Sequence, residues 1–312
     1  MKRFLKTLPL PISGLMLGLA ALGNLLGPYA GGLRYFLGSI SALIFLSLIV
    51  KVLLFPKSLR EGFDNPVVGS IFPTFTMGGM LLSTYINPYF PAGAFGLWVL
   101  SLVLNALIIV LFTKKYVLNF SIKKVFSSYF VMYVGIVVAS VTAPLYGLEA
   151  LGQAVFWFGL FAYLLWLPIV IYRVFWVKEI PEAAKPIAII FAAPASLLLA
   201  GYLSSFPEKS MGMVVFLGSL GLLMTVFALS QMPKMLRLPF YPSYSAFTFP
   251  FVISAIAFNG MTGYFSVQGI ENGALDFIRG FQIAWAAAMV LYVLVRFGML
   301  FQKQAALQKE AA

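Results

Sequence analysis

The sequence of 312 residues contains no cysteine and no histidine. It therefore lacks disulfides, a thiolate nucleophile, an imidazole base and the usual protein ligands of zinc and haem. Charge is also scarce, because 10% of the residues are charged whereas 62% are hydrophobic. So little polar surface cannot cover a soluble globule of this size, and the composition predicts a membrane protein. We expect no catalytic residues, no metal and no cofactor.

Mostly apolar runs of about 20 residues, the length that crosses a bilayer, occur throughout the chain. The ten runs lie near residues 8–27, 33–55, 66–84, 92–112, 128–147, 150–172, 184–204, 211–231, 241–261 and 275–300. The first run follows Lys2, Arg3 and Lys6 and imitates a signal peptide, but nine spans follow it and we expect it to be retained as a helix. The expected fold is an all-α integral membrane protein of ten transmembrane helices, with residues 1–312 forming a single transmembrane domain.

Lysine and arginine predict the orientation of these spans. Of the 21 basic residues, 18 precede the first span or fall on the same side of the membrane, and the exceptions are Arg34, Lys209 and Arg279. Acidic residues show no such bias, with five on the basic side and four on the other. This pattern places both termini in the cytoplasm of a cell (inner or plasma) membrane protein. It also accounts for the net charge of +12, so nucleic acid is not an expected partner.

Odd-numbered and even-numbered spans differ in composition. Odd spans are rich in small residues and carry mid-span breakers, as in "PISGLMLGLAALG" and "YPSYSAFTFPFVISAIA", whereas even spans are bulky and contain all five tryptophans. The midpoints of the odd spans are roughly 56 to 62 residues apart, which indicates five tandem helical hairpins. Because tryptophan favours the membrane boundary, we expect the even helices to form an outer layer. The five odd helices would then form an inner ring around a central pore.

Prolines interrupt three of the odd spans. Pro73, Pro194 and Pro250 each remove a backbone hydrogen bond. The carbonyls that they are expected to free, four residues earlier, are those of Gly69, Ile190 and Ala246. An unsatisfied carbonyl in lipid costs several kcal/mol, so it must face protein or a water-filled cavity. Kinks needed only for packing remain the alternative, and Pro168 in an even span supports that alternative.

Four segments together resemble one known family. They are "PLPISGLMLGLAALGNLL", "NPVVGSIFPTFTMGGMLL", "YVGIVVASVTAP" and "SAFTFPFVISA". They are similar to the tellurite-resistance/dicarboxylate transporter family, which includes bacterial tellurite-resistance membrane proteins, fungal malate and sulfite permeases and the slow-type anion channels of plant guard cells. The resemblance covers essentially all ten spans. It implies five hairpins around a quasi-fivefold pore, a homotrimer, and a pore closed by a phenylalanine on the ninth helix.

The residue that matches this gate is Phe249, immediately before Pro250. In a helical ninth span, an aromatic stripe would share one face and pack against neighbours; it comprises Phe240, Tyr244, Phe247, Phe251 and Phe258. Phe249 would point elsewhere, among slender residues, and the proline after it would make its direction adjustable. A core phenylalanine that fills a gap is the alternative. The third inner helix departs from the family, because Met132 and Tyr133 stand where relatives often place proline.

Small and polar residues of the odd spans are the candidates for the pore wall. Those expected to line it are Gly14, Gly18, Pro73, Thr74, Thr76, Gly135, Pro194, Ser196, Ser245 and Pro250. For the serines and threonines, hydrogen bonds to their own or a neighbouring helix are the competing interpretation. For Gly14 and Gly18, which form a GxxxG pair, the competing interpretation is close helix packing.

No charged residue occurs in the middle of an odd span. Proton- or sodium-coupled carriers usually keep an intramembrane carboxylate, and cation channels use acidic rings or carbonyl filters. We therefore expect a passive channel for small monovalent anions, whose partners are these anions and the lipid bilayer. A secondary transporter for four-carbon dicarboxylates such as malate, or for sulfite, is the alternative. An enzyme is not expected, because no cluster of catalytic side chains is evident.

Overall fold

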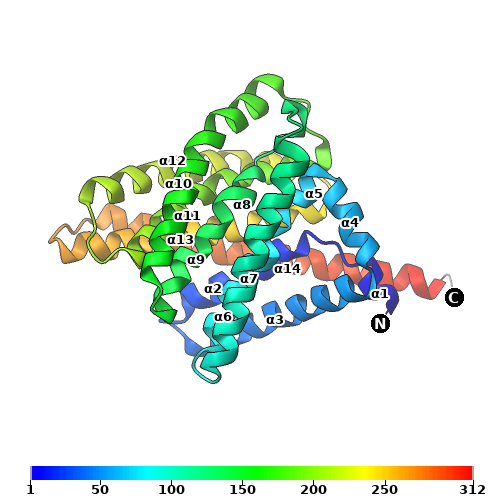
Figure 1. Cartoon of the computed structure of the whole chain (residues 1–312), viewed down its shortest axis with the longest axis horizontal. Coiled ribbons are helices and arrows are strands. Elements are labelled where there is room, and N and C mark those ends of the chain that lie inside the picture. Colours follow the sequence, from blue (N-terminus) through cyan, green and yellow to red (C-terminus); the bar gives the residue numbers. More distant parts are fainter. Residues whose placement is uncertain (1, 311–312) are drawn as a thin grey trace.

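The computed structural model describes residues 2–310, and every regular element in that range is helical (Figure 1). Nine helices of the described chain are long and apolar enough to cross a membrane. They correspond to the second to tenth expected spans. In place of the first lies α2 (Ile12–Leu26), an apolar helix of 15 residues that is shorter than a bilayer requires. The all-α integral membrane class is confirmed, with a first span shorter than expected.

Five long helices expose most of their surface. They are α3 (Gly31–Leu54), α7 (Pro91–Phe112), α10 (Glu149–Tyr172), α12 (Met211–Met235) and α14 (Gly273–Glu310). In the most apolar stretches of the spans that they form, only 22% to 44% of the residues are buried. In the alternate spans the buried share is 72% to 83%. The bulky residues of the five long helices therefore suit contact with lipid tails.

We call these five long helices the outer helices, and the more buried segments that precede each of them, α2 included, the inner segments. Four of the five inner segments are interrupted or change helix type partway. The first of these joins α5 (Pro66–Ile71) to α6 (Pro73–Ile86). The second joins α8 (Tyr129–Val134), the 3-10 turn η3 (Gly135–Val137) and α9 (Val138–Thr142). The third joins the 3-10 helix η6 (Glu182–Ala192) to α11 (Ala193–Ser205), and the fourth joins the 3-10 helix η7 (Pro242–Phe247) to α13 (Phe249–Val267). The break at Gly135 forms without a proline.

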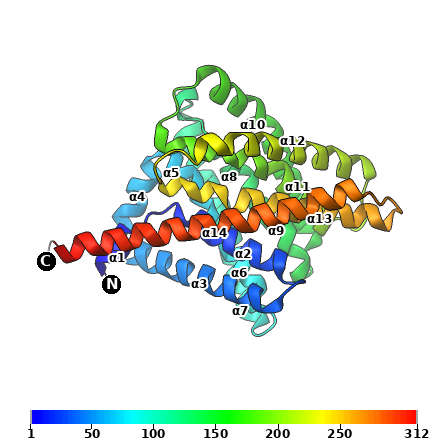
Figure 2. The ribbon, with the colours of Figure 1, turned by 180° about the vertical axis from the view of Figure 1, so that it is seen from behind.

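Short elements connect the spans on the side of the chain ends. They are α1 (Lys2–Thr7), α4 (Pro56–Asp64), η2 (Ile122–Lys124) and the π-helical turns η1 (Thr113–Val117) and η5 (Arg173–Val177), while η4 (Ala143–Tyr146) lies at the opposite side. Both ends of the described chain lie on one side of the molecule, beside α1 (Figures 1 and 2). We call this side the terminal face and the opposite side the far face.

Two cations on the terminal face are buried against backbone. Lys51 is 3% exposed, and its Nζ donates to the carbonyls of Leu5 and Lys6 at 3.1 and 2.8 Å. The ammonium thus caps the C-terminal end of α1, where a positive charge is favourable. Arg173, 1% exposed, donates from Nη2 to the carbonyls of Lys123 and Glu179. These basic residues therefore bind loops to helices.

Each inner segment packs on the outer helix that follows it, and the inner segments also contact one another in sequence. α2 contacts α6, α6 contacts α9, α9 contacts α11, α11 contacts α13, and α13 contacts α2. Figure 2 shows α14 crossing over α13 and α2. The last hairpin therefore packs against the first.

At least one serine or threonine hydroxyl bond joins each neighbouring pair of inner segments. Five such bonds are Ser13 Oγ with Thr74 Oγ1 at 2.6 Å, Ser70 Oγ with Ser128 Oγ at 2.6 Å, Ser205 Oγ to Ser140 O at 2.5 Å, Ser243 Oγ to Ala183 O at 2.6 Å, and Thr248 Oγ1 to Gly14 O at 2.9 Å. Small residues let the backbones approach closely enough for these short bonds. Much of the hydroxyl content of the inner segments therefore serves helix packing.

The tryptophans only partly follow the expected boundary position. Trp157 and Trp176 are exposed, but Trp98 is fully buried and its Nε1 donates to Thr142 Oγ1 at 2.7 Å. Trp166 is also buried, stacked on Tyr133 with ring centroids 5.3 Å apart. These two rings attach outer helices to the third inner segment. Their indole faces provide packing area between layers in addition to any role at the membrane boundary.

Candidate functional site

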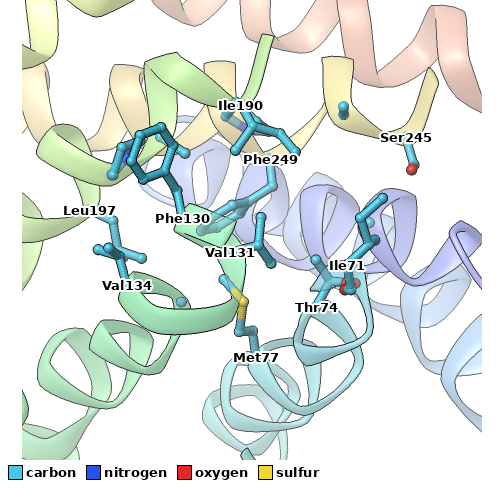
Figure 3. Close-up of a pocket in the computed structure, with 16 residues that line it drawn as sticks. Ile71, Thr74, Met77, Phe130, Val131, Val134, Ile190, Leu197, Ser245 and Phe249 are labelled. Carbon is cyan, nitrogen blue, oxygen red and sulfur yellow. The ribbon is translucent and has the colours of Figure 1, made fainter. Parts of the chain in front are cut away.

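A small cavity, which we call the central cavity, lies among the inner segments at the level of their breaks (Figure 3). Its volume is about 40 Å³, and residues from all five inner segments line it. Seven of the residues singled out from the sequence are in its wall: Gly14, Thr74, Gly135, Pro194, Ser245, Phe249 and Pro250. The structure therefore brings together side chains that are up to 236 positions apart between Gly14 and Pro250.

The rest of the wall is apolar and was not predicted from the sequence to line a pore, although Ile190 and Ala246 were named there for their carbonyls. It consists of Ile71, Met77, Phe130, Val131, Val134, Ile190, Ala193, Leu197 and Ala246. Helical spacing provides the signal that would have found several of them. Val131 lies four residues before Gly135, Leu197 three after Pro194, and Met77 three after Thr74, so each shares a face with a residue already chosen.

Four other candidates lie away from the central cavity. Thr76 accepts a hydrogen bond from Asn105 Nδ2 of α7 at 2.7 Å, so its hydroxyl faces the outer layer. Ser196 donates to its own helix, to Ala192 O at 2.9 Å, and borders a separate gap beside α12. Pro73 is buried at the start of α6 and is not in the wall.

The fourth of these candidates, Gly18, packs against the turn that carries Phe249. A Cβ at Gly18 would stand 2.6 Å from Thr248 Cβ and 3.1 Å from Phe249 N. One at Gly14 would stand 3.0 Å from Ser245 Cβ. The GxxxG pair thus allows α2 to touch the η7–α13 junction. For Gly18, this contact supports the interpretation as close helix packing. Gly14 both packs and lines the central cavity.

The break in the ninth span lies at Thr248, one residue before Phe249. Thr248 has φ −97° and ψ −89°, outside the helical region, and Phe249 is the first residue of α13. Thr248 Oγ1 donates to Ser245 O at 2.7 Å as well as to Gly14 O. In the seventh span, the carbonyl of Ile190 is not free, because it accepts the N–H of Ala193 in a 3-10 turn. The expectation of a freed carbonyl at Ile190 is therefore wrong.

Phe249 differs from the other aromatic residues around it. Tyr244 packs on Phe247 with ring centroids 4.6 Å apart, and Phe251 packs on Trp285 of α14 at 5.9 Å. Phe249 is 5% exposed and makes no ring contact with the other described aromatic residues. In Figure 3 its side chain reaches from α13 towards Phe130 and Val131 of α8.

Three further cavities continue from the central one. Towards the terminal face, an entrance cavity of about 390 Å³ shares Ile71 with it and is lined by the starts of four inner segments. Towards the far face, a far cavity of about 210 Å³ shares Leu197 and Phe249 with it. The far cavity in turn shares Asn24 and Leu81 with a vestibule of about 550 Å³, which we call the Arg34 vestibule. Phe249 thus stands between the central and far cavities.

The walls of these four cavities are almost uncharged. Arg34 is the one ionised side chain among their lining residues, and no carboxylate is among them. The Thr74 hydroxyl is already bonded to Ser13 and to Ile71 O, whereas the Ser245 hydroxyl has no hydrogen-bond partner among the described residues. At the entrance cavity, Tyr241 donates to Glu182 Oε1 at 2.7 Å, and this bond raises the pKa of Tyr241. No group of residues suited to holding a metal occurs within residues 2–310.

Comparison with known proteins assigns the chain to a family. The model of one family, described as voltage-dependent anion channel, matches residues 8–301. This match spans nearly the whole chain and confirms the resemblance drawn from the four sequence segments. A search among curated proteins found no match. The chain belongs to the voltage-dependent anion channel family, which is also the tellurite-resistance/dicarboxylate transporter family.

Proposed function

We propose that the protein is a passive channel for small monovalent anions, whose conduit follows the row of cavities and is closed at rest by Phe249. Membership of the voltage-dependent anion channel family supports anion conduction. The observation that carries the proposal is that Phe249 lines the central and far cavities at once. A single ring at that position would interrupt a path between the two faces.

In this proposal the five inner segments form a ring around the conduit. Their successive contacts, from α2 through α6, α9 and α11 to α13 and back to α2, support it. The central cavity draws its wall from all five segments. The chain would then act as one transmembrane domain of five hairpins in a cell membrane, with the terminal face cytoplasmic, and would assemble as a homotrimer as its family resemblance implies.

The lining chemistry favours anions that release water easily. No carboxylate in the cavity walls would repel an anion. The central cavity offers one free hydroxyl, that of Ser245, and otherwise apolar groups. Such a wall repays little of the cost of removing a tightly held hydration shell. Nitrate and chloride should therefore pass more readily than dicarboxylates.

The gate is tested by removing its ring. Phe249→Ala should raise the anion current several-fold in planar bilayers, because the wall between the two cavities would lose its largest movable group. Phe251→Ala is the matched control, since Phe251 lies two residues further on α13 and packs outward on Trp285. An unchanged current in Phe249→Ala would remove this residue from the mechanism.

The alternative carrier function gives different kinetics. A reversal-potential series across nitrate, chloride, sulfite and malate in proteoliposomes measures selectivity directly. A channel passes ions down any electrochemical gradient, whereas a carrier shows saturation and counterflow. Counterflow of malate or sulfite without a conductive current would replace the channel proposal with the carrier.

A further inference from the structure

Arg34 is held in the Arg34 vestibule by contacts from three sides. It lies in the first turn of α3, where Nε donates to Asn24 Oδ1 at 3.1 Å and Nη2 donates to Thr84 O at 3.1 Å. Its guanidinium carbon stands 4.8 Å from the centroid of the Tyr85 ring. The Tyr85 hydroxyl is itself bonded to Ala20 O at 2.6 Å. The ends of α2 and α6 and the start of α3 thus fix one orientation of the guanidinium.

The charge of Arg34 has no acidic partner within the described chain. No carboxylate lies within ion-pair distance of it, and Nη1 has no hydrogen-bond acceptor among residues 2–310. The other two basic residues of the far face are occupied. Arg279 pairs with Asp276 at 2.8 Å, and Lys209 Nζ donates to Phe206 O at 2.8 Å. Arg34 is therefore the far-face arginine whose charge has no carboxylate partner among the described residues.

The surroundings of Arg34 are roomy and partly polar. The vestibule has a volume of about 550 Å³, and its wall includes Asn24, Thr84 and Thr142. Because Asn24 also lines the far cavity, the site lies directly before the cavity that ends at Phe249. The vestibule and the far cavity share wall residues, so in the proposed channel an ion from the far face would pass the guanidinium on its way towards Phe249.

We propose that Arg34 forms a binding site for one small monovalent anion at the far-face entrance, with Nη1 as the charge-assisted donor. Hydrogen bonds from a guanidinium to an anion are shorter and stronger than those between neutral groups. Asn24 and Thr84 orient the guanidinium, so its free edge is preorganised towards the vestibule. The site raises the local anion concentration beside the far cavity. That consequence rests on the proposed channel function, whereas anion binding itself does not.

The site should act asymmetrically. Anions arriving from the far face meet Arg34 before the gate, and those arriving from the terminal face meet an entrance cavity without a charged lining residue. Half-saturation of the flux should therefore need a lower anion concentration on the far side. The difference should shrink as ionic strength rises, because charges are screened over about 10 Å at 0.1 M salt.

Bromide binding to the full chain tests the site without requiring conduction. In bromide-soaked crystals of the detergent-purified protein, an anomalous peak should lie within hydrogen-bonding reach of Arg34 Nη1. Arg34→Gln should abolish this peak, Arg34→Lys should retain a weaker one, and Arg279→Gln, which removes the same charge from the same face, should leave it unchanged. A wild-type protein without the peak, or Arg34→Gln with it, would overturn the proposal.

Flux into proteoliposomes of fixed orientation tests the functional consequence. Arg34→Gln should raise the half-saturating chloride concentration several-fold for entry from the far face, while the maximal rate and entry from the terminal face stay close to wild type. A bromide peak in a protein that conducts no anion would support the binding site and refute the channel function. A normal half-saturating concentration in a conducting Arg34→Gln variant would refute the role of Arg34 in entry.

Discussion

Gly18→Ala should open the resting channel, because Gly18 supports the turn that carries Phe249. The added Cβ would stand 2.6 Å from Thr248 Cβ and 2.7 Å from Thr248 Oγ1. Carbon atoms pack at about 3.5 to 4.0 Å, so α2 and the Thr248 turn would have to separate by about 1 Å. The atoms in the way are a Cβ, its hydroxyl and the backbone N of Phe249, none of which ends a flexible side chain.

This displacement has an energetic and a functional consequence. Overpacking of this kind costs about 1 to 3 kcal/mol, so thermal unfolding followed by tryptophan fluorescence should shift to a lower midpoint. The separation should also break the 2.9 Å hydrogen bond from Thr248 Oγ1 to Gly14 O. Phe249 would then lose the anchor beside it, and the resting anion current in planar bilayers should rise.

The matched control is Gly263→Ala. Gly263 lies on α13, and a Cβ there meets no atom within 4 Å, so the current should not change and the midpoint should not fall. If Gly18→Ala behaved like Gly263→Ala in both assays, the reasoning about the close contact would be refuted. A lower midpoint with a normal resting current would show that α2 supports the fold without positioning Phe249.

Two further predictions concern hydroxyl groups and protons. Thr76→Val should lower stability by about 1 kcal/mol, because the buried Asn105 Nδ2 loses its acceptor. The current per folded channel should stay unchanged in this variant. Thr74→Val, on the cavity wall of the same helix, should instead alter the nitrate-to-chloride permeability ratio. The conductance should be constant between about pH 6 and 8, since the sequence has no histidine or cysteine and Arg34 keeps its charge throughout. Anion accumulation driven by a pH gradient alone would contradict a passive channel and favour a proton-coupled carrier.

The layered arrangement could be predicted from sequence because composition follows environment. Small residues and breakers recur where segments are buried, and bulky residues recur where helices are exposed. It was harder to predict which residues line the central cavity. Thr74 and Thr76 look equivalent in sequence, but the helix turns one hydroxyl to the central cavity and the other to Asn105. Only tertiary packing decides between them.

The breaks limit inference from helical periodicity most strongly. A single helical wheel across the ninth span assumes one register, whereas the 3-10 geometry of η7 and the dihedrals of Thr248 reset it before α13 begins. The carbonyl expected to be free at Ile190 is satisfied for the same reason, since a 3-10 turn supplies a donor that an α-helical count omits. Gly135 breaks its segment without a proline, so searching for prolines alone would miss that site.

The entrance cavity is lined by the starts of four inner segments, and the Arg34 vestibule by the ends of three. The peptide dipoles of these segments therefore point the same way, although the outer helices that alternate with them along the chain run back in the opposite direction. Each helix start carries roughly half a positive charge. In the proposed channel, the backbone nearest the conduit would thus give it an electrical polarity of its own, with the positive end at the terminal face. Even with neutral side chains in the wall, anion currents in the two directions should then differ.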